Sequence, residues 1–137
     1  MIETAAQALV RLSRVLERSA APLSLADYRV LMTVAAGEER ASRLAQGLAV
    51  GKPSISATVD SLARRGLISR GRVEADQRAV ALSLTDAGRL AYEEAQGRMV
   101  ERLREVLALT ADPEASLRAL VEVGDAHTRL RQARAAS

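Results

Sequence analysis

Residues 66–88 read GLISRGRVEADQRAVALSLTDAG and are the most informative segment for the fold. Residues 67–73 and 79–84 have the composition of two short strands, and in the second one apolar side chains alternate with small ones. The polar residues 74–78 between them predict the tip of a β-hairpin. Thr85 then predicts the start of a long helix, because its hydroxyl can accept a hydrogen bond from a backbone N–H of the first turn.

Helical periodicity on both sides of this hairpin predicts six helices. They are expected near residues 2–19, 25–35, 41–48, 53–65, 86–107 and 113–130. Ser24 and Asp27 form a variant of the capping box for the second helix, and Gly37 and Gly66 end the second and fourth. Asp112 and Pro113 supply an N-cap and a first-turn proline for the last helix. The short helices 41–48 and 53–65 predict a helix-turn-helix. The expected fold class is therefore mainly α with a small β-hairpin wing, a winged helix-turn-helix in the order α-α-α-α-β-β-α-α.

Composition excludes several classes of protein. The 137 residues are 48% hydrophobic and 27% charged, which suits a single folded domain rather than a disordered chain. The chain has no cysteine and one histidine, so it lacks the usual side chains for disulfides, thiol redox chemistry or a zinc site. No apolar run reaches about 18 residues, and the amino terminus does not resemble a signal peptide. We expect a cytoplasmic protein with no cofactor, no metal and no membrane contact.

Positive charge is concentrated in the middle of the chain. Between Arg40 and Arg78 there are eight cationic and three acidic side chains, a local charge of +5 in a chain of net charge +3. Such a segment could face phosphates or could be an ordinary solvated surface. Only two residues are aromatic, which argues against modules that stack unpaired bases on aromatic rings.

The helix expected at 53–65 has two different faces when it is projected at about 100° per residue. The apolar face carries Ile55, Val59 and Leu62 and is expected to face the core. The opposite face is small or polar and consists of Pro53, Ser54, Ala57, Asp60, Ser61 and Arg64. Small side chains with one arginine suit close approach to the groove of a DNA duplex. The alternative is a solvated helix face without a partner.

The hairpin supplies a second set of candidate contacts. Arg78 near the tip could enter a minor groove, where negative potential is concentrated, with Asp76 positioning it through a charge-assisted hydrogen bond. Alternatively, the two side chains only pair with each other in solvent. Arg70 and Arg72 alternate along the first strand and could meet phosphates, as could Lys52 at the start of the preceding helix.

The spacing of these motifs resembles that of the MarR family of winged-helix transcriptional regulators. The resemblance is carried by Arg65-Gly66-Leu67-Ile68, by Asp76-Gln77-Arg78, and by Leu82-Ser83-Leu84-Thr85-Asp86-Ala87-Gly88, and the order of elements extends it over essentially the whole chain. It implies that the helix at 53–65 lies in the major groove and Arg78 in the adjacent minor groove. The sequence departs from the family at Gly51, where a serine cap is usual, and at Ala57, where many members have arginine.

The resemblance also implies a homodimer on a pseudo-palindromic double-stranded DNA operator. Residues 1–22 and 86–133 would form the helical dimerisation region, and residues 23–85 the winged helix-turn-helix region of a single domain, 1–137. The apolar stripes of the first and last helices are the expected interface, namely Ile2, Leu9, Leu12, Leu16, Leu117, Leu120, Val123 and Leu130. Many family members bind a small molecule beside this interface. Such an effector pocket would here be aliphatic, around Leu31, Met32 and Leu90.

Three functions can be compared on this basis. The leading hypothesis is a dimeric, sequence-specific DNA-binding repressor released by a small-molecule effector. The alternative is a winged-helix module that binds protein instead of specific DNA, and the basic segment 40–78 argues against it. An enzyme has the least support, because no nucleophile–base pair is apparent and His127 lies between apolar residues of the last helix, where an interface or surface role is the simpler interpretation.

Overall fold

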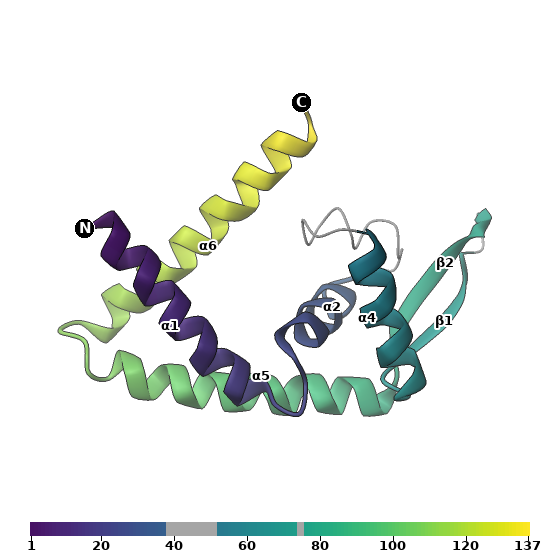
Figure 1. Cartoon of the computed structure of the whole chain (residues 1–137), viewed down its shortest axis with the longest axis horizontal. Coiled ribbons are helices and arrows are strands. Elements are labelled where there is room, and N and C mark those ends of the chain that lie inside the picture. The colour runs from purple at the N-terminus through teal and green to yellow at the C-terminus, as the bar shows by residue number, and fades with distance from the viewer. Residues whose placement is uncertain (38–51, 74–75) are drawn as a thin grey trace. The chain divides into compact units, whose positions relative to one another are not determined.

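The structure is a computed structural model that describes the backbone of residues 1–37, 52–73 and 76–137. Side chains are described for the same residues except 52–53, 72–73 and 76–79. The elements are α1 (Ile2–Ala20), α2 (Leu25–Ala35), α4 (Lys52–Arg64), β1 (Ile68–Val73), β2 (Asp76–Leu84), α5 (Asp86–Leu107) and α6 (Pro113–Ala135), as Figure 1 shows. This mainly helical order with one hairpin confirms the expected fold class. The helix expected at 41–48 lies outside the described residues.

Local capping signals decide where the helices begin and end. At the start of α2, the Ser24 hydroxyl accepts from the Asp27 N–H at 3.0 Å, and the Asp27 carboxylate accepts from the Ser24 N–H at 3.0 Å. Gly37 after α2 has a φ of 109°, and Gly66 after α4 has a φ of 75°, a region that favours glycine over side-chain-bearing residues. The capping box and both glycine stops were predicted correctly.

The hairpin is antiparallel and begins its second strand earlier than expected. Ile68 pairs with Leu84, Arg70 with Leu82 and Arg72 with Val80, after which the register shifts and Val73 pairs with Asp76. The prediction that residues 74–78 form the tip was therefore wrong for 76–78, which belong to β2. Hydropathy indicates which residues are buried, whereas backbone pairing continues along a hairpin through polar residues as well.

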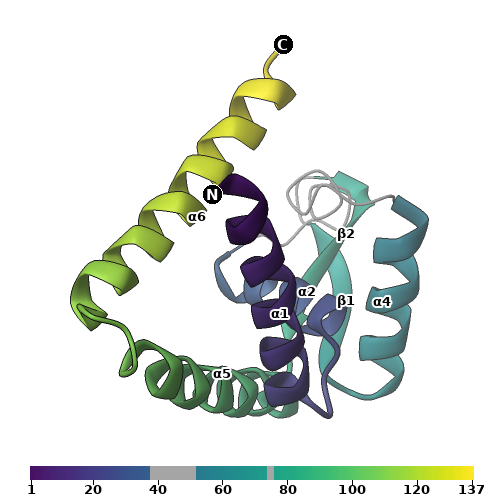
Figure 2. The ribbon, with the colours of Figure 1, turned by 60° about the vertical axis from the view of Figure 1, so that its left-hand side comes forward.

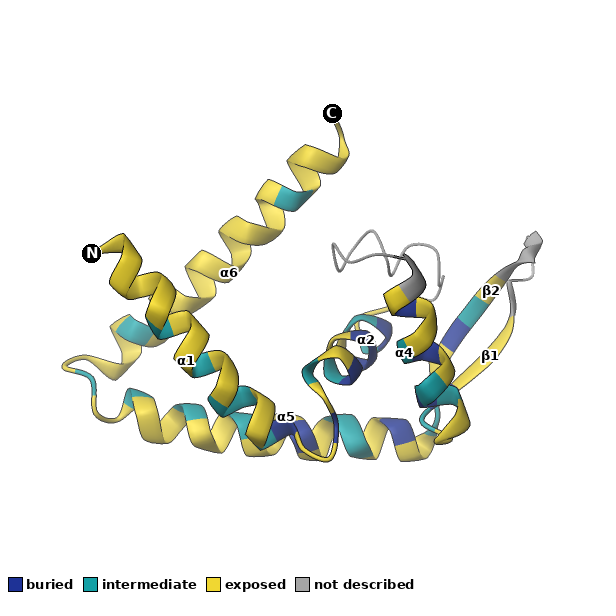
Figure 3. Cartoon of the chain, in the orientation of Figure 1, coloured by how far each residue is buried: buried dark blue, intermediate teal, exposed yellow. Residues whose placement is uncertain are grey.

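The core lies in the unit Met1–Met99, one of two compact units of the chain. The largest fully buried side chains are Leu31 and Val30 of α2, Leu62 of α4 and Leu82 of β2. Figure 3 shows the buried residues on α2, α4 and the hairpin, and Figure 2 shows α4 beside the strands. The apolar face of α4 thus packs against both α2 and β1. Burial of these side chains is the main stabilisation of the unit.

The junction between α4, the hairpin and α5 is held by Thr85. Its hydroxyl donates to the Gly66 carbonyl at 2.6 Å and accepts from the Gly88 N–H at 2.9 Å. Its own N–H donates to the Leu67 carbonyl at 3.2 Å. A Cβ at Gly88 would lie 1.9 Å from that Leu67 carbonyl oxygen, so the two backbones approach too closely for any side chain. The Thr85 and Gly88 of the sequence motif therefore have a structural role.

The second unit, Val100–Ser137, contains the end of α5 and all of α6. The Asp112 carboxylate caps α6 by accepting from the Ala115 N–H at 3.0 Å, with Pro113 in the first turn, as the sequence predicted. No residue of α6 is buried, and Figure 3 shows it almost wholly exposed. Among the described residues, no helix is both long and apolar enough to cross a membrane.

Candidate nucleic-acid interface

The outer face of α4 is the centre of the candidate site. Ile55, Val59 and Leu62 are only 6%, 4% and 0% exposed, which fixes the core side of the helix as expected. The opposite side carries Ser54, Ala57, Asp60 and Arg64, all exposed, and the partly exposed Ser61. We call these five residues the α4 outer face. Its side chains are short except for Arg64 at the end of the helix, so another surface can approach the helix backbone closely.

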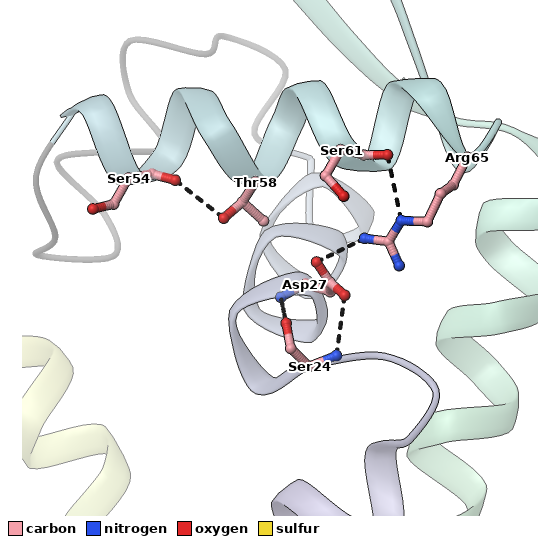
Figure 4. A network of polar contacts seen from close by, with 6 residues as sticks. All are labelled: Ser24, Asp27, Ser54, Thr58, Ser61 and Arg65. Atoms are coloured by element: carbon pink, nitrogen blue, oxygen red, sulfur yellow. Dashed lines mark hydrogen bonds and ion pairs between the residues drawn. The ribbon is translucent and has the colours of Figure 1, made fainter.

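A network of polar contacts ties the end of α4 to the start of α2. The Arg65 Nη2 lies 2.9 Å from the Asp27 Oδ1, and the Arg65 Nε donates to the Ser61 carbonyl at 3.3 Å, as Figure 4 shows. Asp27 is only 8% exposed and also accepts the capping bond from Ser24. Because a buried carboxylate is costly without partners, this pair fixes α4 against α2.

Sequence reasoning did not find the role of Arg65. The sequence pattern places Arg65 only in the Arg65–Ile68 motif and identifies Asp27 only as a helix cap. A possible signal was that Asp27 lies between the inward positions of α2, where a charge needs a cationic partner. The partner itself is distant in the sequence, and no local pattern identifies it. Arg65 therefore positions the α4 outer face, whereas the neighbouring Arg64 is exposed on it.

A second ion pair connects the α4 outer face with the hairpin. The Arg70 guanidinium of β1 pairs with the Asp60 carboxylate of α4, and the two side chains are 44% and 54% exposed. Arg70 had been expected to meet phosphates, and Asp60 had been given no role. In this structure the charge of Arg70 is offset by a neighbour, so a phosphate would have to compete with Asp60 for it.

The remaining predicted contacts are placed by their backbone alone. Lys52 and Pro53 are the first two residues of α4, and Arg72 lies opposite Val80 in the hairpin. Asp76 and Arg78 lie in β2, where the register shifts. Their side chains are outside the described residues, so the contact between Asp76 and Arg78 stays a prediction.

The expected interface residues are unusually exposed for apolar side chains. On α1, Ile2 and Leu9 are 77% and 57% exposed, while Leu12 and Leu16 are half-buried. On α6 the exposed fractions are 45% for Leu117, 39% for Leu120, 63% for Val123 and 49% for Leu130. Two apolar faces are thus left uncovered, each within its own unit.

The three residues expected around an effector pocket lie in different environments. Leu31 is fully buried in the core, whereas Met32 and Leu90 are 41% and 57% exposed. The two tyrosines stack nearby in the same unit, with ring centroids 5.2 Å apart. Burial raises the pKa of Tyr28 to about 12, with a further contribution from Tyr92. Tyr28 is partly buried and packs against the core.

The helices, the hairpin and the exposed α4 outer face define a winged-helix protein, and comparison with known proteins shows what it resembles. Residues 21–79 match the sequence model of the MarR family. A search of curated proteins gave no match. Several solved structures have the same fold over almost the whole chain.

Three of these structures illustrate the likeness. The transcriptional repressor CouR, solved bound to a 23-mer DNA duplex, is 25% identical, with a TM-score of 0.79 over 90% of this chain and 89% of that one. Wild-type MarR from E. coli in its apo form is 22% identical, with a TM-score of 0.77 over 89% and 93%. YusO from Bacillus subtilis is 23% identical, with a TM-score of 0.70 over 92% of each chain. Residues 21–79 thus resemble the MarR family, and the likeness to solved structures extends the same winged-helix fold over most of the chain.

Proposed function

We propose that this protein is a homodimeric, sequence-specific repressor that binds double-stranded DNA through the α4 outer face and the hairpin wing. The observation that carries the proposal is the division of α4 into a buried apolar face and an exposed face of short side chains ending in Arg64. A helix whose outer side chains are short fits the major groove, which is about 12 Å wide. CouR, with the same fold, was solved on a DNA duplex.

Each predicted contact has a distinct role in this proposal. Ser54, Ala57, Ser61 and Arg64 face base edges, and an arginine is the commonest side chain to read guanine. Lys52 and Pro53 at the helix start, with Arg70 and Arg72 on the wing, lie near phosphates, and Arg78 enters the minor groove beside Asp76. Phosphate contacts set the register, and the base contacts set the sequence preference.

Dimerisation through residues 1–22 and 86–133 is part of the same proposal. The apolar stripe of α6 stays exposed within its own unit, and covering a leucine or valine fully is worth about 1.5–3 kcal/mol. A second copy meeting this stripe across a two-fold axis would bury it and would set two α4 helices about one turn of DNA apart. The residues 23–85 then form the DNA-binding part of each subunit.

We also propose that binding of a small molecule releases the protein from the DNA. Its support is the resemblance to the family, and Met32 and Leu90 are the exposed apolar residues that an aliphatic ligand would contact. A ligand that binds one dimer geometry better than another shifts the population toward it.

The experiment that tests the function is selection of bound sites from a random duplex library, followed by titrations at two salt concentrations. The proposal expects a pseudo-palindrome with half-sites about 10–10.5 base pairs apart and an affinity that falls steeply with salt. Light scattering on the same sample should give a dimer mass. Binding that ignores sequence would contradict the base-reading role of α4, and no salt-dependent binding at all would favour the protein-interaction alternative.

A further inference from the structure

Asp60 is a carboxylate in the middle of the surface that the proposed function assigns to the DNA. Ala57 and Arg64 lie about one turn before and after it on the same side of α4. Its side chain is 54% exposed, so it would face the duplex directly. Phosphates and the major-groove edges of guanine and thymine offer only acceptors, whereas adenine and cytosine each present an amino donor. A carboxylate here is therefore favourable only where the amino group of adenine or cytosine lies opposite it.

The partner of Asp60 is a cation that the duplex would otherwise attract. Arg70 reaches Asp60 because α4 packs against β1, and because Arg70 lies opposite Leu82, which is 1% exposed and faces the core. Arg70 therefore projects from the side of the hairpin that covers α4. As long as the ion pair persists, the charge of Arg70 is offset and one potential phosphate contact is missing.

We propose that Asp60 is a specificity-determining residue that acts by holding Arg70 and by keeping a negative charge on the α4 outer face. Where guanine or thymine lies opposite Asp60, the carboxylate meets only acceptors and Arg70 stays paired, so binding is weakened. On a preferred site a base amino group opposite Asp60 can donate to the carboxylate, and Arg70 is released to a phosphate. The inference rests on the proposed function, because it concerns the sequence preference of the same surface.

The test compares Asp60→Asn with the wild-type protein on two duplexes. One is the duplex enriched from a random library by the wild-type protein, and the other has the same length and a scrambled sequence. Releasing one cation to a phosphate raises affinity about tenfold at roughly 0.1 M salt and steepens the salt dependence by about one unit. Asp60→Asn should therefore bind the scrambled duplex about tenfold more tightly per subunit. The enriched duplex should gain about threefold or less, so the ratio of the two affinities falls.

Two further variants separate this mechanism from a general charge effect. Glu93→Gln makes the same change in net charge on an exposed residue of α5 and should leave the ratio unchanged. In an Arg70→Ala background, Asp60→Asn should lose the part of its gain on the scrambled duplex that comes from releasing Arg70, and should keep only the part that comes from removing a negative charge. Thermal melting of each variant checks that the fold is intact.

The outcomes distinguish this inference from the proposed function. An unchanged affinity ratio for Asp60→Asn, an equal gain from Glu93→Gln, or full additivity with Arg70→Ala would overturn the role of Asp60 and leave DNA binding standing. A wild-type protein that binds neither duplex in a salt-dependent manner would overturn both. The inference would be established if Asp60→Asn lowers the ratio of the affinities for the enriched and scrambled duplexes, and if this decrease is smaller in the Arg70→Ala background.

Discussion

Replacing Gly88 by alanine tests the junction between α4, the wing and α5. An added Cβ would lie 1.9 Å from the Leu67 carbonyl oxygen and 2.8 Å from its carbonyl carbon. Both atoms are backbone, so relief requires α5 to move away from the chain that leads into β1. That movement stretches the hydrogen bonds of Thr85 to Leu67 and to Gly66, at 3.2 and 2.6 Å. The substitution should therefore destabilise the whole first unit.

The magnitude follows from opposing contributions. Overpacking costs about 1–3 kcal/mol, and each strained hydrogen bond costs about 1 kcal/mol more. Alanine in place of glycine inside a helix increases stability by about 1 kcal/mol through its higher helix propensity. The free energy of unfolding of Gly88→Ala should thus fall by roughly 2–4 kcal/mol, which lowers Tm by roughly 6–16 °C for a chain of this size.

Gly97→Ala is the matched control. Gly97 lies in the same helix, is exposed, and has nothing within 4 Å of an added Cβ. This variant should keep the full benefit of helix propensity and gain up to about 1 kcal/mol. Urea unfolding followed by circular dichroism measures both variants. If Gly88→Ala is as stable as Gly97→Ala, the backbone of α5 does not approach Leu67 as closely as the structure indicates.

Three other predictions concern the positioning pair, the DNA contacts and the pH dependence of stability. Arg65→Ala leaves Asp27 without its cation and should lower the free energy of unfolding by about 1–3 kcal/mol in urea titrations, and an unchanged value would contradict the positioning role. Arg64→Ala should weaken binding to the preferred duplex by about 1–3 kcal/mol and reduce the base preference at one position of the site. Arg78→Ala should weaken binding to the preferred and scrambled duplexes alike, and the slope of log affinity against log salt should become less steep by about one unit per half-site. Tyr28 has a pKa of about 12 in the folded chain against 10.0 in the unfolded chain, so its contribution to stability is complete below pH 10 and is lost as the pH rises toward 12. In melting experiments, Tyr28→Phe should therefore lose less stability between pH 10 and pH 12 than the wild-type protein does.

Features set by neighbouring residues could be predicted from the sequence. The capping box at Ser24, the glycine stops at Gly37 and Gly66, and the caps at Thr85 and Asp112 all occur where expected. Each depends on contacts within a few residues, so a local pattern contains the needed information. The core side of α4 was also predictable, because helical period alone assigns its faces.

Features set by contacts between distant segments could not be predicted. The Arg65–Asp27 and Arg70–Asp60 pairs depend on how α4 packs on α2 and β1, and the charge count of the segment gave no hint that two of its cations have internal partners. The start of β2 at Asp76 was missed for a similar reason, since cross-strand pairing extends beyond the apolar residues that hydropathy detects.

Cross-linking can show whether the α4 outer face lies in the major groove. The chain has no cysteine, so Ala57→Cys introduces a single thiol on the exposed face, and Gln96→Cys places one on the exposed side of α5. Each thiol is coupled to a short photoactivated cross-linker and irradiated with the enriched duplex. If the α4 outer face lies in the major groove, position 57 should cross-link to bases in the major groove of each half-site, and position 96 should give few cross-links. Absence of base cross-links from position 57, or equal yields from both positions, would contradict this placement.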